Sequence, residues 1–364
     1  MRGRRVRRAA GGRHVIRSLT RRMLGTAAAA VDRMATAAVT AHAQRTGQAG
    51  ERPHADRVRL LERLDARFRD ASLDGFFAEP QLITPGERVV RKRGRDGTVT
   101  DLSWHSGFQL LDPEVRERYE SATENSLAVA RRFQRGQGRP AVILIHGYMA
   151  GPFAFEERIW PIGALERAGF DVVLFTLPFH GQRARAGQGA VPEFPGPDPR
   201  LNVEGFRQAL FDLQNLIGWL LGSGHPRVGV LGMSLGGYTA ALLAGVERRL
   251  DFVVPVIPLS SLGDFAREQG SLSPVAEEAA LQHTLLESIY RRVDPIARPS
   301  LVPPDRCLVI AAKADRVTPA AHARRLSVHL RAPLQSFYGG HLLQLGRAEA
   351  FEGVLELMST PRKT

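Results

Sequence analysis

The chain has 364 residues, of which 43% are hydrophobic, and this suits one large α/β domain plus an extension. A net charge of +13 would suggest nucleic acid or an anionic membrane as a partner, but residues 1–50 alone hold eleven arginines, no lysine and one acidic residue. The rest of the chain has no basic stripe with interleaved aromatic residues, which argues against nucleic-acid binding by the folded part. A single cysteine, Cys307, excludes a disulfide or a cysteine-based metal site within one chain.

Two segments are expected to precede the main domain. Residues 1–54 form an Arg- and Ala-rich extension that is predicted to be poorly ordered. Residues 55–84 are predicted to form a helical segment packed on the core, because apolar residues recur there at helical spacing. The extension lacks the ~18 apolar residues of a membrane span, so no transmembrane helix is predicted and a cytoplasmic location is expected. A targeting segment and peripheral membrane contact through the arginines stay open as alternatives.

The main domain is predicted to cover residues 85–364. It opens with two strand-like segments, Glu87 to Lys92 and Thr98 to Trp104, which flank the hairpin signal Asp96-Gly97. The stretch from Thr123 to Phe133 is predicted to be helical.

From residue 141 onwards, strand-like and helix-like segments alternate. The strand-like segments are 141–145, 172–175, 228–231, 252–257, 307–312 and 334–338, and the helix-like ones are 160–168, 203–221, 237–244, 320–330 and 347–358. Fully apolar strands between helices predict a mostly parallel central sheet with helices on both faces. Residues 259–305 interrupt the alternation and are predicted to form a small helical cap.

A sharp turn between strand and helix is predicted at Gly232-Met-Ser234-Leu-Gly236. Glycine two residues on either side of the serine leaves room where strand and helix come close together. The helix that follows directs its N-terminal N–H groups at the same point, which favours an oxyanion above Ser234. We therefore predict that Ser234 is a catalytic nucleophile and that the Leu235 N–H is one oxyanion donor.

An activated serine needs a base and a group that orients the base. His341 follows the last predicted strand, where two glycines allow a sharp turn, and is the predicted base. Asp315 lies in the turn after the preceding strand and is the predicted acid, while Asp264 is the alternative. The chain order of Ser234, Asp315 and His341 is the order expected of this architecture.

The second oxyanion donor is expected in the loop after strand 141–145, which reads His146-Gly147-Tyr148. Small residues in this loop point to the Tyr148 N–H as the donor. His146 is expected to brace the loop and not to take part in catalysis.

In these motifs and their order the chain resembles the α/β-hydrolase superfamily over about residues 85–360. The matching elements are the His146-Gly147 loop, the turn at 177–181, the elbow around Ser234, the Asp315 turn and the His341 loop. The resemblance implies an α/β-hydrolase fold. The chain departs from the pattern before the acid, where alanines and a lysine stand in place of the usual glycine.

The predicted function is hydrolysis of a carboxylester or of an acyl or lipid-like substrate, through a Ser-Asp-His triad and an acyl-enzyme. No metal or cofactor motif is found in the sequence, so no cofactor and no metal are expected. Phe153, Phe155 and Phe179, together with the cap, are candidates for lining an acyl pocket. Acyl transfer to an acceptor other than water and a non-catalytic binding role remain alternatives.

Overall fold

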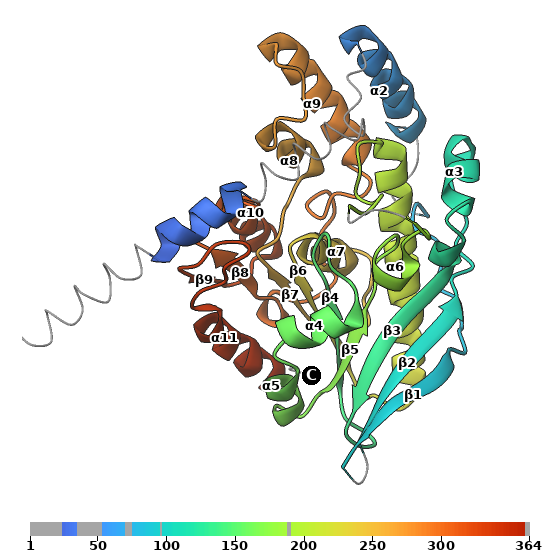
Figure 1. Ribbon diagram of the computed structural model, residues 1–364, viewed down its shortest axis with the longest axis vertical. Helices are drawn as coiled ribbons and strands as arrows, with labels where there is room; N and C mark the ends of the chain where they lie inside the picture. The colour runs from blue at the N-terminus through green and yellow to red at the C-terminus, as the bar shows by residue number, and fades with distance from the viewer. Residues whose placement is uncertain (1–23, 35–52, 70–74, 95–96, 188–190, 361–364) are drawn as a thin grey trace, which may run out of the picture.

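The computed structural model describes residues 24–34, 53–69, 75–94, 97–187 and 191–360. Within them, nine strands form one sheet in the order β1-β2-β3-β5-β4-β6-β7-β8-β9 (Figure 1). The strands are β1 (Gly86–Arg93), β2 (Gly97–His105), β3 (Leu127–Gln134), β4 (Ala141–Ile145), β5 (Asp171–Phe175), β6 (Val228–Met233), β7 (Leu250–Val256), β8 (Val309–Ala312) and β9 (Leu334–Phe337). Pairing is antiparallel from β1 to β3 and between β3 and β5, and parallel from β5 to β9.

Helices cover both faces of this sheet (Figure 1). Those on one face are α6 (Pro199–Gly222), α7 (Leu235–Ala244) and α10 (Ala320–Leu330), and those on the other are α4 (Phe153–Ile159), α5 (Ile162–Arg167) and α11 (Arg347–Ser359). Successive side chains of a strand alternate between the faces, so that Ile143 of β4 lies in one core and Val142 in the other. The mostly parallel sheet between two helical layers is confirmed.

Short elements connect the rest of the described chain. They are α3 (Arg116–Glu120) and the 3-10 turns η1 (Pro113–Val115), η2 (Thr123–Ser126), η3 (Gly181–Arg183) and η4 (Pro304–Arg306). None of the described helices has the length and unbroken apolarity that a bilayer crossing requires.

The structure has a strand, β3, where the sequence favours a helix. The prediction of helix from Thr123 to Phe133 is wrong, because η2 leads directly into β3. Strand β3 pairs with β2 on one side and β5 on the other, and Ala128 and Ala130 are fully buried in the sheet. Pairing with two neighbouring strands thus overrides the local preference of this segment.

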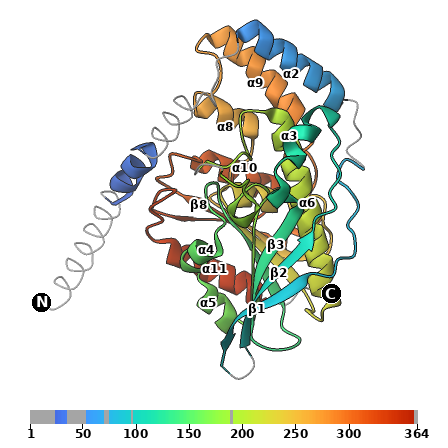
Figure 2. The same ribbon diagram turned by 45° about the vertical axis from the view of Figure 1, so that its right-hand side comes forward.

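The predicted cap at 259–305 contains α8 (Leu262–Glu268) and α9 (Ala276–Tyr290). Helix α2 (His54–Arg69), from the segment expected to pack on the core, lies beside α9 in both views (Figures 1 and 2). Arg292, just after α9, donates from Nε to Phe68 O of α2 at 3.0 Å. Helix α2 therefore packs against α9 of the cap, and its buried residues Leu61, Leu64 and Phe68 belong to the hydrophobic core on that side of the sheet.

Part of the N-terminal extension is helical. Residues 24–34 form a helix in which the side chain of Asp32 is fully buried. Composition alone does not indicate this helix, because the contacts of Asp32 are made with residues far away in the sequence. Residues 1–23 and 35–52 lie outside the described residues, as does the hairpin turn at 95–96.

Candidate active site

Ser234 occupies the tight turn between β6 and α7, as predicted. Its backbone has φ 56° and ψ −113°, which is a strained conformation for a residue that carries a Cβ. A Cβ on Gly232 would overlap Gly236 O, and a Cβ on Gly236 would overlap Ile145 O. Close backbone approach therefore requires glycine at both positions, and it fixes the serine at the end of β6 with 7% of its surface exposed.

His341 and Asp315 form a hydrogen-bonded pair on the loops after β9 and β8. His341 Nδ1 lies 2.8 Å from Asp315 Oδ2. Asp315 Oδ1 accepts hydrogen bonds from the backbone N–H groups of Val317 at 2.8 Å and Thr318 at 2.7 Å. These contacts fix the carboxylate, which orients the imidazole ring through its Nδ1–H.

The serine and the histidine–aspartate pair lie at the same edge of the sheet. Strands β6 to β9 are parallel, so their carboxyl ends meet at one edge, and Ser234, Asp315 and His341 follow three of these ends. Among the described residues, neither Ser234 Oγ nor His341 Nε2 makes a hydrogen bond. Catalytic hydrogen bonds are often long in a free enzyme and shorten in the substrate complex. Among the described residues, Nε2 is thus the His341 ring nitrogen without a hydrogen-bond partner.

Thr318 contacts both members of the His341–Asp315 pair. Its Oγ1 lies 3.0 Å from His341 Nδ1 and 3.1 Å from Asp315 Oδ2, and donates to Ile257 O at 3.0 Å. A threonine before a proline is typical of a helix start, but the N-cap of α10 is Pro319. No local signal in the sequence indicates that Thr318 contacts His341.

The loop after β4 lies against the serine and has an internal brace. A Cβ placed on Gly147 would lie 3.4 Å from Ser234 Cβ. His146 Nε2 accepts from the Leu177 N–H at 3.0 Å, so its Nδ1 carries the hydrogen and donates to Gly147 O at 2.7 Å. A trans peptide directs its C=O and N–H in opposite directions, so this bond directs the Tyr148 N–H away from the His146 ring.

The His146 ring is neutral in this setting. Burial lowers the pKa of His146 from 6.5 to about 4, against a smaller opposite effect of the bond to Gly147 O. The ring of His180 lies alongside, with the ring centroids 5.0 Å apart, and burial holds the pKa of His180 well below its ordinary value as well. Two neutral histidines therefore support the loop, which agrees with the bracing role expected for His146.

Asp264, the alternative acid, is engaged elsewhere. It lies in α8, where Oδ1 accepts from Arg267 at 2.5 Å and lies 3.0 Å from His283 Nε2, while Oδ2 accepts from Arg325. None of its hydrogen bonds within the described residues goes to His341. The structure thus pairs the histidine with Asp315.

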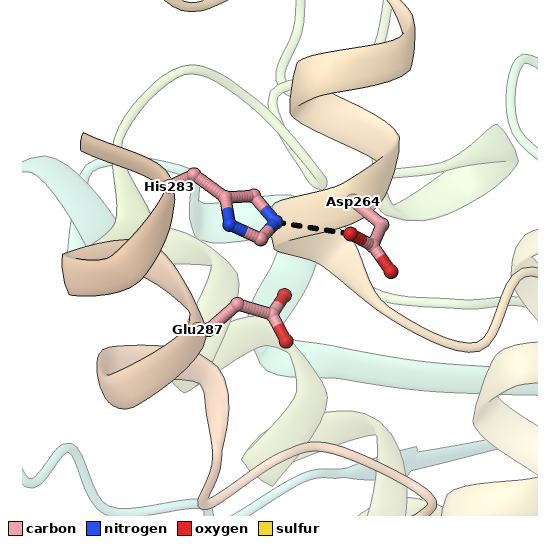
Figure 3. A group of neighbouring side chains, drawn as sticks. All are labelled: Asp264, His283 and Glu287. Atoms are coloured by element: carbon pink, nitrogen blue, oxygen red, sulfur yellow. Dashed lines mark hydrogen bonds and ion pairs between the residues drawn. The ribbon is translucent and has the colours of Figure 1, made fainter. Parts of the chain in front are cut away.

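The side chains of Asp264, His283 and Glu287 form a cluster in the cap that resembles a cation site (Figure 3). Their potential ligand atoms lie within 4.8 Å of one another. However, the guanidinium group of Arg325 already binds Asp264, and Glu287 accepts a hydrogen bond from Ser261 Oγ at 2.5 Å. A cationic side chain on the central carboxylate opposes the binding of a metal ion, so the residues fit an ion-pair network joining α8 and α9.

The three phenylalanines proposed to line an acyl pocket lie in different surroundings. Phe153 and Phe179 are buried in the cores on opposite faces of the sheet. Phe155 of α4 is 49% exposed. The structure therefore does not bring the three rings together as one wall.

No family model matches the chain. In sequence it is 31% identical over 276 residues to uncharacterized proteins from two strains of Mycobacterium tuberculosis, CDC 1551 / Oshkosh and H37Rv. The match covers 73% of this chain and 65% of each relative, which is just under two thirds of their length.

Solved structures with this architecture include acetyl xylan esterase 1 from Thermoanaerobacterium sp., with a TM-score of 0.53 and 18% identity over 82% of this chain and 93% of that one. Another is the acetyl xylan esterase from Paenibacillus sp. R4, with a TM-score of 0.50 and 16% identity over 85% of this chain and 98% of that one. Together with the parallel sheet and the strained serine after β6, these likenesses show that the chain has the α/β-hydrolase fold. The resemblance seen in the sequence motifs is confirmed at the level of the fold.

Proposed function

We propose that the chain is a serine hydrolase that cleaves a carboxylic ester through an acyl-enzyme. The observation that carries this proposal is the Asp315–His341 hydrogen bond of 2.8 Å, at the sheet edge where Ser234 stands in a strained turn. Strain at a residue in a cleft or at a strand end is typical of functional sites. A histidine oriented by a buried acid is the base that an otherwise weak serine nucleophile requires.

In the proposed reaction, His341 Nε2 removes the proton of Ser234 Oγ as the oxygen attacks the ester carbonyl. The tetrahedral intermediate collapses when the bond to the leaving alcohol breaks, and His341 returns the proton to that alcohol. Water then attacks the acyl group on Ser234 by the same route, which releases the carboxylic acid and restores the serine. Asp315 stabilises the imidazolium ion that forms in each half of the cycle.

The oxyanion would be held by two backbone N–H groups. Leu235 is the first residue of α7, so its N–H has no acceptor one turn earlier within the helix and lies directly after the nucleophile. The Tyr148 N–H belongs to the peptide whose carbonyl His146 holds. Removal of one such donor costs about 3–4 kcal/mol of transition-state stabilisation in measured enzymes, so two preset donors would supply a large part of the rate.

The two proteins with similar structures make small acyl groups the first substrates to try. Both are acetyl xylan esterases, so acetyl esters, including acetylated xylan fragments, are the starting point of an ester panel. Because this chain is only 18% and 16% identical to them in sequence, the likeness guides only the choice of the first substrates. Longer acyl chains follow in the same panel, because hydrophobic pockets discriminate chain length only modestly.

The decisive experiment is covalent labelling with a fluorophosphonate, followed by intact mass and peptide mapping. Wild type should gain one label on Ser234, and Ser234→Ala and His341→Ala should gain none within the same time. Asp264→Asn should label like wild type. A folded wild type that is neither labelled nor active on the ester panel would contradict the proposal. Added alcohol or amine then tests acyl transfer, since a transferase would form the new ester or amide in preference to the free acid.

A further inference from the structure

A buried carboxylate from the N-terminal helix contacts both loops of the site. Asp32 Oδ2 accepts from the His341 N–H at 2.8 Å and from the Arg316 N–H at 3.2 Å, and Oδ1 accepts from the Leu342 N–H at 3.0 Å. Two of these donors are the consecutive backbone N–H groups of His341 and Leu342. The third donor belongs to Arg316, the residue directly after Asp315. One side chain thus joins the loop of the base to the loop of the acid.

The carboxylate of Asp32 is buried and accepts hydrogen bonds from backbone N–H groups. Its side chain is 0% exposed, and a buried carboxylate is costly unless hydrogen-bond donors surround it. Three backbone N–H groups meet that need, and bonds from N–H to carboxylate are among the stronger hydrogen bonds in proteins. In return, Asp32 is the acceptor found within the described residues for the N–H groups of His341 and Leu342.

The backbone of the His341 loop is shaped to admit this helix. A Cβ on Gly340 would lie 2.7 Å from Asp32 Oδ2 and 3.2 Å from the carbonyl carbon of Ala28. On the helix side, a Cβ on Gly25 would lie 3.1 Å from Tyr338 O. Glycine on each side lets the two backbones approach closely, so the contact involves the whole helix face, including the fully buried Ala28.

We propose that Asp32 is a positioning residue of the hydrolytic site, an inference that rests on the function proposed above. Asp315 fixes the imidazole of His341 at Nδ1, and Asp32 fixes the backbone from which that imidazole projects. Both constraints are needed to direct Nε2 towards Ser234. The hydrogen bond at Nδ1 fixes one atom of the ring, and the position of the backbone fixes the point at which the side chain begins. Helix 24–34 is accordingly part of the catalytic unit, although its composition resembles that of a disordered tail.

The test compares the purified full chain with Asp32→Asn, which keeps the size of the side chain but presents an NH2 group to one set of N–H donors. Hydrolysis of an acetyl ester and the rate of fluorophosphonate labelling are measured well below the melting temperature of each protein. We expect kcat and the labelling rate to fall about 10- to 100-fold, with KM changed by less than about threefold. Arg33→Ala, an exposed neighbour on the same helix, is the matched control and should behave as wild type.

A second variant keeps the proposal testable if Asp32→Asn does not fold. Gly340→Ala leaves Asp32 in place but pushes its carboxylate away from the loop, and it should show the same selective fall in kcat. Amide exchange of the peptide that spans His341 and Leu342 should become faster in both variants, because at least one of its two N–H groups loses its acceptor. If wild type is active and both folded variants keep its kcat, the positioning role of Asp32 is refuted while the proposed function stands. If wild type is inactive and unlabelled, the proposed function fails and this inference fails with it.

Discussion

Thr318 Oγ1 lies 3.0 Å from Nδ1 of His341, the same nitrogen that Asp315 contacts. Because its own hydrogen can go to Ile257 O, the hydroxyl can accept part of the hydrogen bond from Nδ1–H. Thr318→Val removes this acceptor and leaves Ile257 O without its donor. We expect kcat to fall about 3- to 10-fold, the size of one net hydrogen bond. Steady-state kinetics on an acetyl ester measure it, and Thr318→Ser should retain nearly all activity.

Asp315→Asn keeps the shape of the acid but presents either an amide NH2 or a weaker acceptor to His341. The imidazole is then left in the wrong tautomer or loses its charge stabilisation, and kcat should fall about 10,000-fold, as for comparable triads. Asp264→Asn is the matched control, because its carboxylate is bound by Arg267 and Arg325 in the cap. Comparable losses in the two variants would mean that the acid is assigned to the wrong residue.

Gly236→Ala tests the close packing at the nucleophile elbow. The added Cβ would overlap Ile145 O, a backbone atom that can move only if β4 moves. We expect the free energy of unfolding to fall by about 3 kcal/mol or more, together with loss of labelling at Ser234. Urea unfolding measures this change. In Gly222→Ala, at the end of α6, the new Cβ meets no atom within 4 Å, so stability should stay the same or rise slightly.

The burial of His146 predicts a pH dependence of stability. The pKa of His146 is about 4 in the folded protein but 6.5 when exposed, so the unfolded chain binds more protons between these values. The free energy of unfolding therefore has its full value above pH 6.5 and falls as the pH drops towards 4, by about 3 kcal/mol from this residue. His180 acts with the same sign.

Urea unfolding at several pH values between 7.5 and 4.5 measures this dependence. His146→Gln should flatten the curve, although the remaining slope from His180 persists. The exposed His105, changed to Gln, is the control and should leave the slope as in wild type. An unchanged slope in His146→Gln would show that His146 takes up its proton in the folded state as easily as in the unfolded chain.

The sequence predicts most of the fold because the central parallel strands β4, β5 and β6 are apolar runs that are fully buried, although the edge strand β9 is mostly exposed. It fails at β3, where pairing with β2 and β5 decides the structure and leaves little mark on the local pattern. Likewise Ser234, Asp315 and His341 stand at strand ends that can be located from composition alone. Thr318 and Asp32 contact His341 across long stretches of the chain, and no local pattern can indicate such contacts.

The contact between Asp32 and His341 spans 309 positions and so bears on how the protein matures during translation. The ribosome makes residues 24–34 long before the His341 loop, and a domain generally folds as one unit. Until that loop has been made, the N–H donors of Arg316, His341 and Leu342 are not present for Asp32. The residues around Ser234 are made early, but the contact between helix 24–34 and the His341 loop can form only after the last strand has been synthesised.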